Sequence, residues 1–190
     1  MLFRSAAPTL AEAIPNTIRH LGPDDIQRCK AIRLACLADA PFAFGSTFEG
    51  ESAEPDSWWA TRLTDGYWIV AEQAGEDLGV AMLMRQGLPA SFQPDESADA
   101  RLPEQSDYLW IRAVWIRPEH RGRGIVDQLC GHLVERAAQA GEPVIILGVR
   151  QGNDRAQRAY ERMGFAAVGT FNPVTSSTHL TNSLMALPLG

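Results

Sequence analysis

A short, basic and glycine-rich turn, which connects an apolar strand to an apolar helix, constrains the fold of this chain more than any other feature. The turn has the sequence RGRGI over residues 121–125, and the segment before it, residues 110–116, is apolar except at Arg112. After the turn, apolar residues recur every four positions in two adjacent rows, Ile125, Leu129, Leu133 and Ala137 beside Val126, Cys130, Val134 and Ala138. Two such rows form one apolar helix face. The pattern predicts a helix from Arg123 to Ala140 that follows a strand directly.

The start of that helix predicts an anion-binding site. The first N–H groups of a helix lack partners within it, and the positive end of the helix dipole lies there. Gly122 and Gly124 allow a ligand to approach the backbone closely, and Arg121 and Arg123 add donors suited to phosphate. Taken alone, the turn is equally compatible with a solvated basic connection. A dinucleotide-binding motif is excluded because Asp127 stands where its third glycine belongs, and the chain has no Gly-Lys-Ser/Thr.

A second group of residues follows one strand later. Residues 144–149 form a continuous apolar run, as expected of a strand buried on both faces. In the predicted helix after it, from Asn153 to Met163, Asn153 suits the N-cap, and Ala156 and Tyr160 lie one turn apart on one face. Gly164 suits the position just past the helix. Each residue has an ordinary structural explanation, which does not account for the glycine-rich turn one strand earlier.

Together the two groups resemble the GCN5-related N-acetyltransferase (GNAT) family. The pyrophosphate loop of that family, Q/R-x-x-G-x-G/A, is matched from Arg121 through Gly124. Its segment L-x-V-x-x-x-N-x-x-A-x-x-x-Y-x-x-x-G-F is matched in full by Leu147, Val149, Asn153, Ala156, Tyr160, Gly164 and Phe165. Upstream positions resemble the N-terminal part of an uncharacterised bacterial branch: Arg33, Leu37, Asp39, Pro41, residues 43–47 and Trp59. The resemblance extends over residues 17–187.

The resemblance implies an α+β fold with a mixed, largely antiparallel sheet and helices on both faces. Its fourth and fifth strands, here residues 108–117 and 144–149, would splay apart, and the helix between them makes them parallel neighbours with a right-handed connection. We expect residues 17–190 to form a single domain after an N-terminal extension, residues 1–16. Residues 86–107 carry prolines, acids and small residues without an apolar period, which predicts a polar loop insertion at the surface.

The resemblance also implies acetyl-CoA as the donor, a primary amine as the acceptor, direct transfer between them and no metal. Backbone groups of Val114, Trp115 and Ile116 would hold the pantetheine and the thioester carbonyl. The pyrophosphate would lie on the turn and the helix start, which comprise Arg121, Gly122, Arg123, Gly124, Ile125 and Val126. Asn153 would contact the pantetheine arm. Tyr160 would protonate the leaving thiolate, since a phenol with a pKa of ~10 is protonated at neutral pH.

Two positions depart from the family pattern. Val126 stands where the family has a second Gly or Ala. Its N–H can still bind phosphate, but a side chain directed at the ligand would crowd the pyrophosphate. Some relatives use a Glu early in the fourth strand as general base, and that position falls near Trp110. Asp107 and Glu72 are the nearest substitutes, and both also fit surface carboxylates. A water chain, or an amine that arrives neutral, would remove the need for a base.

Composition narrows the class of protein further. The net charge of −6 argues against binding to nucleic acid or to an anionic membrane. The chain has no apolar run near the ~18 residues of a membrane span, and residues 1–16 lack the apolar stretch of a signal peptide, so a cytoplasmic location is expected. The three cysteines form no C-x-x-C pair, and the four histidines have no metal-ligand spacing. The sequence is compatible with a homodimer.

The favoured function is therefore an N-acetyltransferase that acts on a small-molecule amine. A non-catalytic acyl-CoA-binding or regulatory domain is the alternative, which Val126 and the missing Glu favour. A third and weaker interpretation is an RNA-binding Arg-Gly segment, because the segment is short and the chain is acidic. The acceptor pocket would form from residues 40–56, 86–107 and 172–181. The first of these contains Glu49, Glu51, Glu54 and Asp56, which either attract a cationic acceptor (a polyamine, an aminoglycoside or a basic peptide terminus) or form a solvated face.

Overall fold

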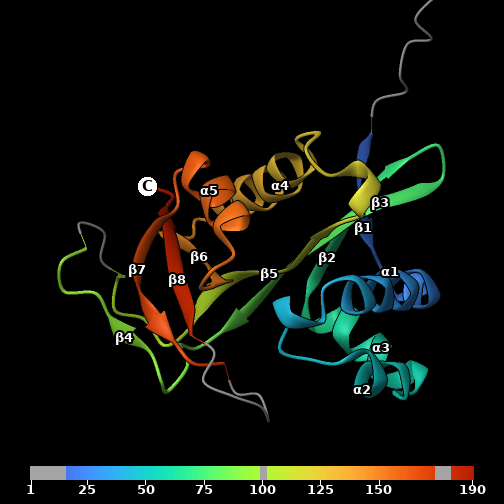
Figure 1. The fold of residues 1–190 in the computed structure, drawn as a ribbon, viewed down its shortest axis with the longest axis horizontal. Helices are drawn as coiled ribbons and strands as arrows, with labels where there is room; N and C mark the ends of the chain where they lie inside the picture. Colours follow the sequence, from blue (N-terminus) through green and yellow to red (C-terminus); the bar gives the residue numbers. More distant parts are fainter. Residues whose placement is uncertain (1–15, 99–101, 174–180) are drawn as a thin grey trace, which may run out of the picture.

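One eight-stranded sheet organises the computed structural model, which describes residues 16–98, 102–173 and 181–190 (Figure 1). Of the expected N-terminal extension, only Asn16 lies within the described residues. The strands are β1 (Thr17–Leu21), β2 (Tyr67–Gln73), β3 (Glu76–Gln86), β4 (Gln93–Pro94), β5 (Tyr108–Ile116), β6 (Val144–Arg150), β7 (Ala166–Phe171) and β8 (Asn182–Pro188). The helices are α1 (Ile26–Asp39), α2 (Phe48–Ser52), α3 (Asp56–Asp65), α4 (Ile125–Gln139) and α5 (Asp154–Arg162), with 3-10 turns at Pro23–Asp25, Pro41–Ala43 and Pro118–His120.

The strand order is β1-β2-β3-β5-β6-β8-β7-β4. Neighbouring strands are antiparallel except β5 and β6, which α4 connects as parallel neighbours. This arrangement confirms the predicted α+β class and the largely antiparallel sheet. Among the described residues, no helix combines the length and the apolar content that crossing a bilayer requires.

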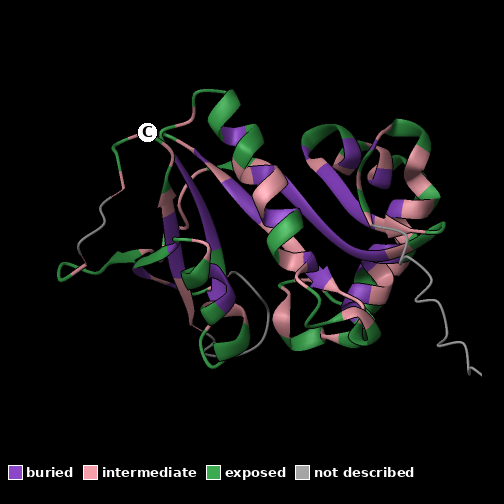
Figure 2. Ribbon diagram, turned by 90° about the horizontal axis from the view of Figure 1, so that it is seen from above, coloured by how far each residue is buried: buried purple, intermediate pink, exposed green. Residues whose placement is uncertain are grey.

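Helices cover both faces of the sheet, as predicted. Side chains alternate between the faces along each strand: in β2, Trp68 and Val70 pack with α1 and α3, whereas Ile69 and Ala71 pack with α4. Tyr160 of α5 belongs to the same buried cluster as α4, so α4 and α5 share one face. Figure 1 shows these two helices together on one side and α1 to α3 on the other, and Figure 2 shows the buried positions following the strands.

Local signals set the ends of α5 and α4. The side chain of Asn153 accepts a hydrogen bond from the backbone N–H of Ala156 at 3.2 Å, which makes it the N-cap of α5. At the other end, the N–H groups of Gly164 and Phe165 donate to carbonyls one turn back, with Gly164 at φ 92°. Helix α4 begins at Ile125, two residues later than predicted, because Gly124 has left-handed backbone angles.

Residues 86–107 lie at the surface, and none of the described residues in this segment is buried, but the segment also adds a strand and apolar contacts to the sheet. Gln93 and Pro94 form β4 at the sheet edge and pair with β7. Leu88, Phe92 and Leu102 pack on a third cluster of buried residues, which covers β5, β6, β7 and β8 on the face away from α4. Three isolated apolar residues have no period, so the sequence pattern could not reveal that this segment takes the place of a helix over that half of the sheet.

A buried ion pair connects α1 to α2. Arg33 donates two hydrogen bonds to the Glu51 carboxylate, at 3.0 and 2.9 Å, and both side chains are only about a twentieth exposed. Burial alone would raise the pKa of Glu51, but the hydrogen bonds and charge of Arg33 outweigh it, so the pKa is lowered from 4.5. The pair fixes both ends of residues 40–47, a segment that the site below uses.

We expect Glu51→Gln to lower the free energy of unfolding by about 3 kcal/mol at pH 7, because it leaves Arg33 buried without a counter-charge. Since the folded pKa of Glu51 is lowered, its contribution is present above the unfolded pKa of ~4.3 and is lost as pH falls through the folded value. We therefore expect the difference in the free energy of unfolding between wild type and variant, measured by urea unfolding from pH 3 to 7, to become smaller toward low pH.

Asp107→Asn is the matched control. Asp107 pairs with Arg85 at 3.0 Å, and these side chains are 42% and 48% exposed. An exposed pair contributes about 1 kcal/mol or less. Equal losses in the two variants at pH 7 would contradict the role given to the buried pair.

Candidate functional site

A β-bulge in the middle of β5 shapes the site. Val80 of β3 faces Trp115 and Met82 faces Arg112, so the single residue between them, Ala81, opposes two residues of β5. One of those two, Ala113, has φ 55°, a left-handed conformation that a residue other than glycine seldom adopts. Such strain persists only where the surrounding structure enforces it, and it is concentrated at functional sites.

Strands β5 and β6 part at this bulge. They pair at three positions, Leu109 with Ile145, Trp110 with Ile146 and Ile111 with Leu147, and at none beyond, although both strands are described to their ends. The backbone of Val114 to Ile116 therefore has no strand partner on its β6 side. This is the splay that the sequence comparison with the GNAT family predicted.

The glycine-rich turn lies at the wide end of this splay. Gly122 and Gly124 have φ 79° and 75°, so both need the left-handed freedom of glycine. No side chain caps α4 at Gly124, and the N–H groups of Ile125, Val126 and Asp127 have no carbonyl of their own helix to donate to. The start of α4 therefore has the unpartnered N–H groups from which the sequence predicted an anion-binding site.

A cavity of about 480 Å³ opens between the turn, β5, α5 and the segment after α1. Its size suits a small-molecule site. The sequence-predicted residues that line it are Val114, Trp115, Ile116, Arg121, Gly122, Gly124, Ile125, Val126, Asn153 and Tyr160. Arg123 is not among the lining residues, and its side chain contacts His120 at 3.3 Å. The splay and the crossover thus bring together two groups of residues that lie a strand and a helix apart in the sequence.

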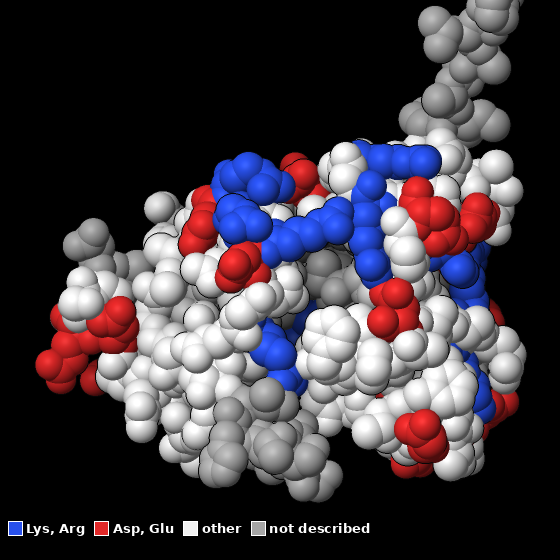
Figure 3. Space-filling view, viewed as in Figure 1, with Lys and Arg blue, Asp and Glu red and all other residues white. Residues whose placement is uncertain are grey.

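Several lining residues were not singled out for the site from the sequence. Arg155 and Arg162 of α5 lie on its cavity face with Ala159, and Figure 3 shows basic side chains along the rim of the central hollow, over α4 and α5. Their spacing of seven from Arg155 to Arg162 could have placed them beside Ala159. Phe42 and Phe44 form the opposite wall, and Phe42 is 67% exposed. Both phenylalanines lie within residues 40–56, one of the segments that the sequence analysis expected to form the acceptor pocket.

Asp39, at the end of α1, connects the two walls. Its carboxylate accepts a hydrogen bond from the Trp115 indole N–H at 2.8 Å and another from the Arg121 guanidinium. The Nε of Arg121 also donates to the Ile116 carbonyl at 3.0 Å. Arg121 is therefore held against β5, and Asp39 balances part of the positive charge at the turn.

Tyr160 is buried on the inner face of α5, 7% exposed, with its ring edge-on to Phe165. Burial, with a smaller effect of the nearby Cys130, raises the pKa of the phenol well above its ordinary value of 10. The hydroxyl therefore stays protonated throughout the neutral range, which a proton donor in the cavity requires.

The other reactive side chains are occupied or inert. Glu72 accepts a hydrogen bond from Arg28, and Asp107 pairs with Arg85. Neither lines the cavity, and the Trp110 indole donates to the Gln86 carbonyl at 3.0 Å. The three cysteines, Cys29, Cys36 and Cys130, are buried, and burial raises the pKa of each thiol to about 12, so they are neutral at pH 7.

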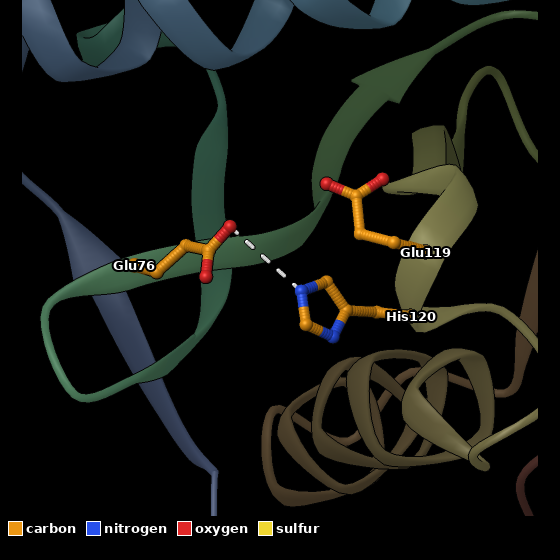
Figure 4. Close-up of side chains that lie close together, drawn as sticks. All are labelled: Glu76, Glu119 and His120. Atoms are coloured by element: carbon orange, nitrogen blue, oxygen red, sulfur yellow. Dashed lines mark ion pairs between the residues drawn. The ribbon is translucent and has the colours of Figure 1, made fainter.

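Glu76, Glu119 and His120 lie close together beside the turn (Figure 4). Both carboxylates are on exposed residues, and Glu76 lies 3.7 Å from the His120 ring and 3.9 Å from Arg117. A guanidinium at that distance competes with a cation for the carboxylate. We therefore interpret the cluster as an ion-pair network.

The splayed sheet and the glycine-rich helix start define an acyltransferase fold of the kind that holds its donor between two parallel strands. The family model "Acetyltransferase (GNAT) family" matches residues 33–165, and the chain belongs to this family. It is 26% identical to the L-methionine sulfoximine/L-methionine sulfone acetyltransferase of Pseudomonas aeruginosa, across 80% of this chain and 81% of that protein. It is 25% identical to an uncharacterised Mycobacterium leprae protein, across 86% of this chain but only 38% of that protein.

Solved structures share the fold. A Salmonella typhimurium acetyltransferase with its cofactor acetyl-CoA has a TM-score of 0.63 at 20% identity, over 92% of this chain and 94% of that one. A GNAT acetyltransferase of Streptococcus pneumoniae has a TM-score of 0.66 at 15% identity, over 92% and 99%. The family and the fold predicted from the two motifs are thereby confirmed, as is the class of enzyme, an acyltransferase.

Gly124, which has a left-handed backbone, and Gly131, which lies inside α4, make a matched pair for a stability measurement. We expect Gly124→Ala to lower the free energy of unfolding by about 1–2 kcal/mol, because an added Cβ meets little but the backbone is left-handed. Gly131→Ala, inside α4 with nothing within 4 Å of an added Cβ, should raise it by about 0.5–1 kcal/mol. Urea denaturation measures both, and an unchanged or higher stability of Gly124→Ala would contradict the assigned backbone conformation.

Proposed function

We propose that this protein transfers the acetyl group of acetyl-CoA directly to a primary amine of a small molecule. The observation that carries the proposal is that three features line one cavity. They are the glycine-rich turn at the start of α4, the part of β5 that no longer pairs with β6, and the protonated phenol of Tyr160. Support comes from the structural neighbour solved with acetyl-CoA and from relatives whose names specify amino-acid acceptors, the Pseudomonas enzyme and an L-amino acid N-acyltransferase of Escherichia coli.

The residues present fit acetyl-CoA as donor. In the proposal, the N–H groups from Gly122 to Val126 and the Arg121 side chain hold the pyrophosphate, because they combine unpartnered donors with positive charge. The unpaired backbone of Val114 to Ile116 holds the pantetheine and polarises the thioester carbonyl. The Asn153 side chain is already committed to capping α5, so its contact with the pantetheine arm uses the capacity that the cap leaves free.

The chemistry proposed is direct transfer. The amine nitrogen attacks the thioester carbonyl carbon, the carbon–sulfur bond breaks, and the phenol of Tyr160 supplies a proton to the sulfur while the amine loses one to solvent. The Tyr160 phenolate then takes a proton back from solvent, which restores the acid. A covalent acetyl-enzyme is not invoked, since the three buried thiols are neutral. Positioning of the amine against the thioester accounts for most of the expected rate.

A non-catalytic acyl-CoA-binding domain is the alternative. The absence of a carboxylate at Trp110 favours it, as does the ion pairing of Glu72 and Asp107 elsewhere. Tyr160 argues against it, because a buried phenol inside a ligand cavity serves catalysis better than binding. Tight binding of acetyl-CoA without turnover of any amine in a broad panel would establish the alternative.

Tyr160→Phe tests the proposed acid. We expect kcat to fall about 10²-fold, at the low end of the range for general acids because a thiolate is a good leaving group, with little change in the KM for acetyl-CoA. Tyr108→Phe is the control, since this buried tyrosine donates to the Pro103 carbonyl at 2.7 Å and lies outside the cavity lining. Full kcat in Tyr160→Phe would remove Tyr160 from the mechanism.

Val126→Ala tests the departure from the family pattern. Val126 lines the cavity but also packs against the core cluster beneath α4, so its side chain does not occupy the ligand space fully. We expect the KM for acetyl-CoA to change less than about threefold, while the free energy of unfolding falls by about 1 kcal/mol. Val134→Ala, which packs on the same cluster outside the cavity, should match the stability loss. A tenfold lower KM in Val126→Ala alone would show that Val126 crowds the pyrophosphate.

A further inference from the structure

Three arginines lie on the face of the sheet opposite α4, at the point where β5 and β6 part. Trp68, Met82 and Arg112 are successive partners across β2, β3 and β5, and therefore share a face. Trp68 and Met82 belong to the cluster under α1 and α3, so Arg112 points to that side. Arg62, at the end of α3, lies over the Trp68 ring at 5.5 Å.

The third arginine comes from the far side of the splay. Arg150 pairs with Asn182 of β8, and the alternation along both strands places the two side chains on the same face as Ile146 and Leu184. Gly148, between Ile146 and Arg150 on that face, is exposed although it lies within a strand. An added Cβ at Gly148 would lie 2.7 Å from the Phe171 ring, so Phe171 borders this part of the sheet, between the residues packed under α1–α3 and those packed under residues 86–107. Figure 3 shows basic side chains within the crevice between these two parts.

The positive charge on this face is not neutralised within the described residues. Glu51 is the carboxylate whose charge acts on Arg62, but it already accepts two hydrogen bonds from Arg33. Burial, followed by the charges of neighbouring arginines, lowers the pKa of Arg112, and burial together with Arg33 also lowers that of Arg62. Like charges in a partly buried place oppose one another and leave a demand for an anion.

Polar atoms at the same place lack partners. The Nε of Arg62, the Nε of Arg150 and the Oδ1 of Asn182 are buried and form no hydrogen bond. Aromatic rings hold the guanidiniums in position, with Trp58 at 4.6 Å from Arg62 and Trp110 at 5.1 Å from Arg112. Arg112 also donates to the Gln86 Oε1 at 2.9 Å, but neither a ring nor a neutral amide supplies a negative charge. Buried donors without acceptors cost stability, which a bound ligand can recover.

The crevice adjoins the proposed reaction centre. Arg112 immediately precedes the bulge, and Val114, two residues later, lines the cavity. The Arg112 guanidinium lies over the Trp110 ring and donates to the Gln86 side-chain Oε1 at 2.9 Å. An acceptor whose amine reaches the thioester beside Val114 would have to draw this guanidinium away from Gln86. The chemical group that a guanidinium pairs with best, through two parallel hydrogen bonds, is a carboxylate.

We propose that Arg112, flanked by Arg62 and Arg150, binds a carboxylate of the acceptor, and that the acceptor is an α-amino acid. This inference rests on the proposed acetyl transfer. It replaces the expectation that the acidic residues of the 40–56 segment attract a cationic acceptor. Glu51 is buried with Arg33, and Asp56 accepts a hydrogen bond from Gln27 and lies 3.8 Å from Lys30.

The test compares each amino acid with its own amide and with the corresponding decarboxylated amine. A panel of standard L-amino acids, their amides and their amines is assayed with acetyl-CoA by release of free thiol. The amide has the less basic amine, so reactivity alone favours the amide. We expect at least one amino acid to exceed its amide in kcat/KM by about tenfold or more.

Variants then locate the preference. Arg112→Gln should reduce the acid-to-amide ratio of kcat/KM by about tenfold, and Arg112→Lys should restore part of the ratio. Arg150→Gln should act in the same direction. Arg85→Gln is the control, because Arg85 lies on the neighbouring strand β3 but pairs with Asp107 and Glu142 at the surface. Thermal unfolding of each variant confirms that it is folded.

The outcomes separate this inference from the proposed function. Turnover of neutral amines or amides with no amino acid preferred over its amide would overturn the carboxylate site and leave the acetyltransferase standing. An acid preference that Arg112→Gln and Arg150→Gln both retain would also overturn it. No turnover of any amine, with acetyl-CoA still bound, would instead contradict the proposed function.

Discussion

The site depends on a conflict between the two hydrogen-bonded ladders of β5. Up to Ile111, this strand pairs with β3 on one edge and with β6 on the other. The bulge at Ala113 then takes two residues of β5 against one of β3, which turns its backbone and ends the ladder to β6. A strand inside a sheet thereby exposes backbone donors and acceptors as if it were an edge, and exposed strand edges readily bind extended ligands.

The crossover connection directs a second set of backbone groups at the same gap. Because β5 and β6 are parallel, the helix between them must start beyond the carboxyl end of β5, so the N-terminus of α4 lies at the opening of the splay. The left-handed backbone at Gly122 and Gly124 makes the tight entry to that helix. Asp39 then ties the turn to α1 through Arg121, so the residues around both proposed substrates are mechanically connected.

The sequence predicted the features that local chemistry specifies and missed those that arise between distant segments. The Asn153 cap, the Gly164 stop and the start of α4 follow from residue type and spacing, and the splay followed from a resemblance carried by Tyr160 and its neighbours. Arg33 and Glu51 lie 18 residues apart in the sequence, where their charges alone would predict two exposed side chains. The packing of Leu88, Phe92 and Leu102 has no period to reveal it. Tertiary pairing, which a single sequence does not display, decided each of these.

The distribution of charge across β5 argues that the two faces of the splay serve different substrates. On the α4 and α5 side, Arg121 and Arg162 are balanced by Asp39 and Asp127, so the proposed donor would meet a rim whose positive charge is partly compensated. On the other side, the Nε atoms of Arg62 and Arg150 are buried without partners, and Arg112 donates only to the neutral side chain of Gln86. Repulsion between the partly buried guanidiniums of Arg62 and Arg112 destabilises the free protein, and proteins retain such destabilising groups where they bind a ligand. A chain selected for stability alone would place an apolar residue at 112, between Met84 and Trp110, where the packing already suits one.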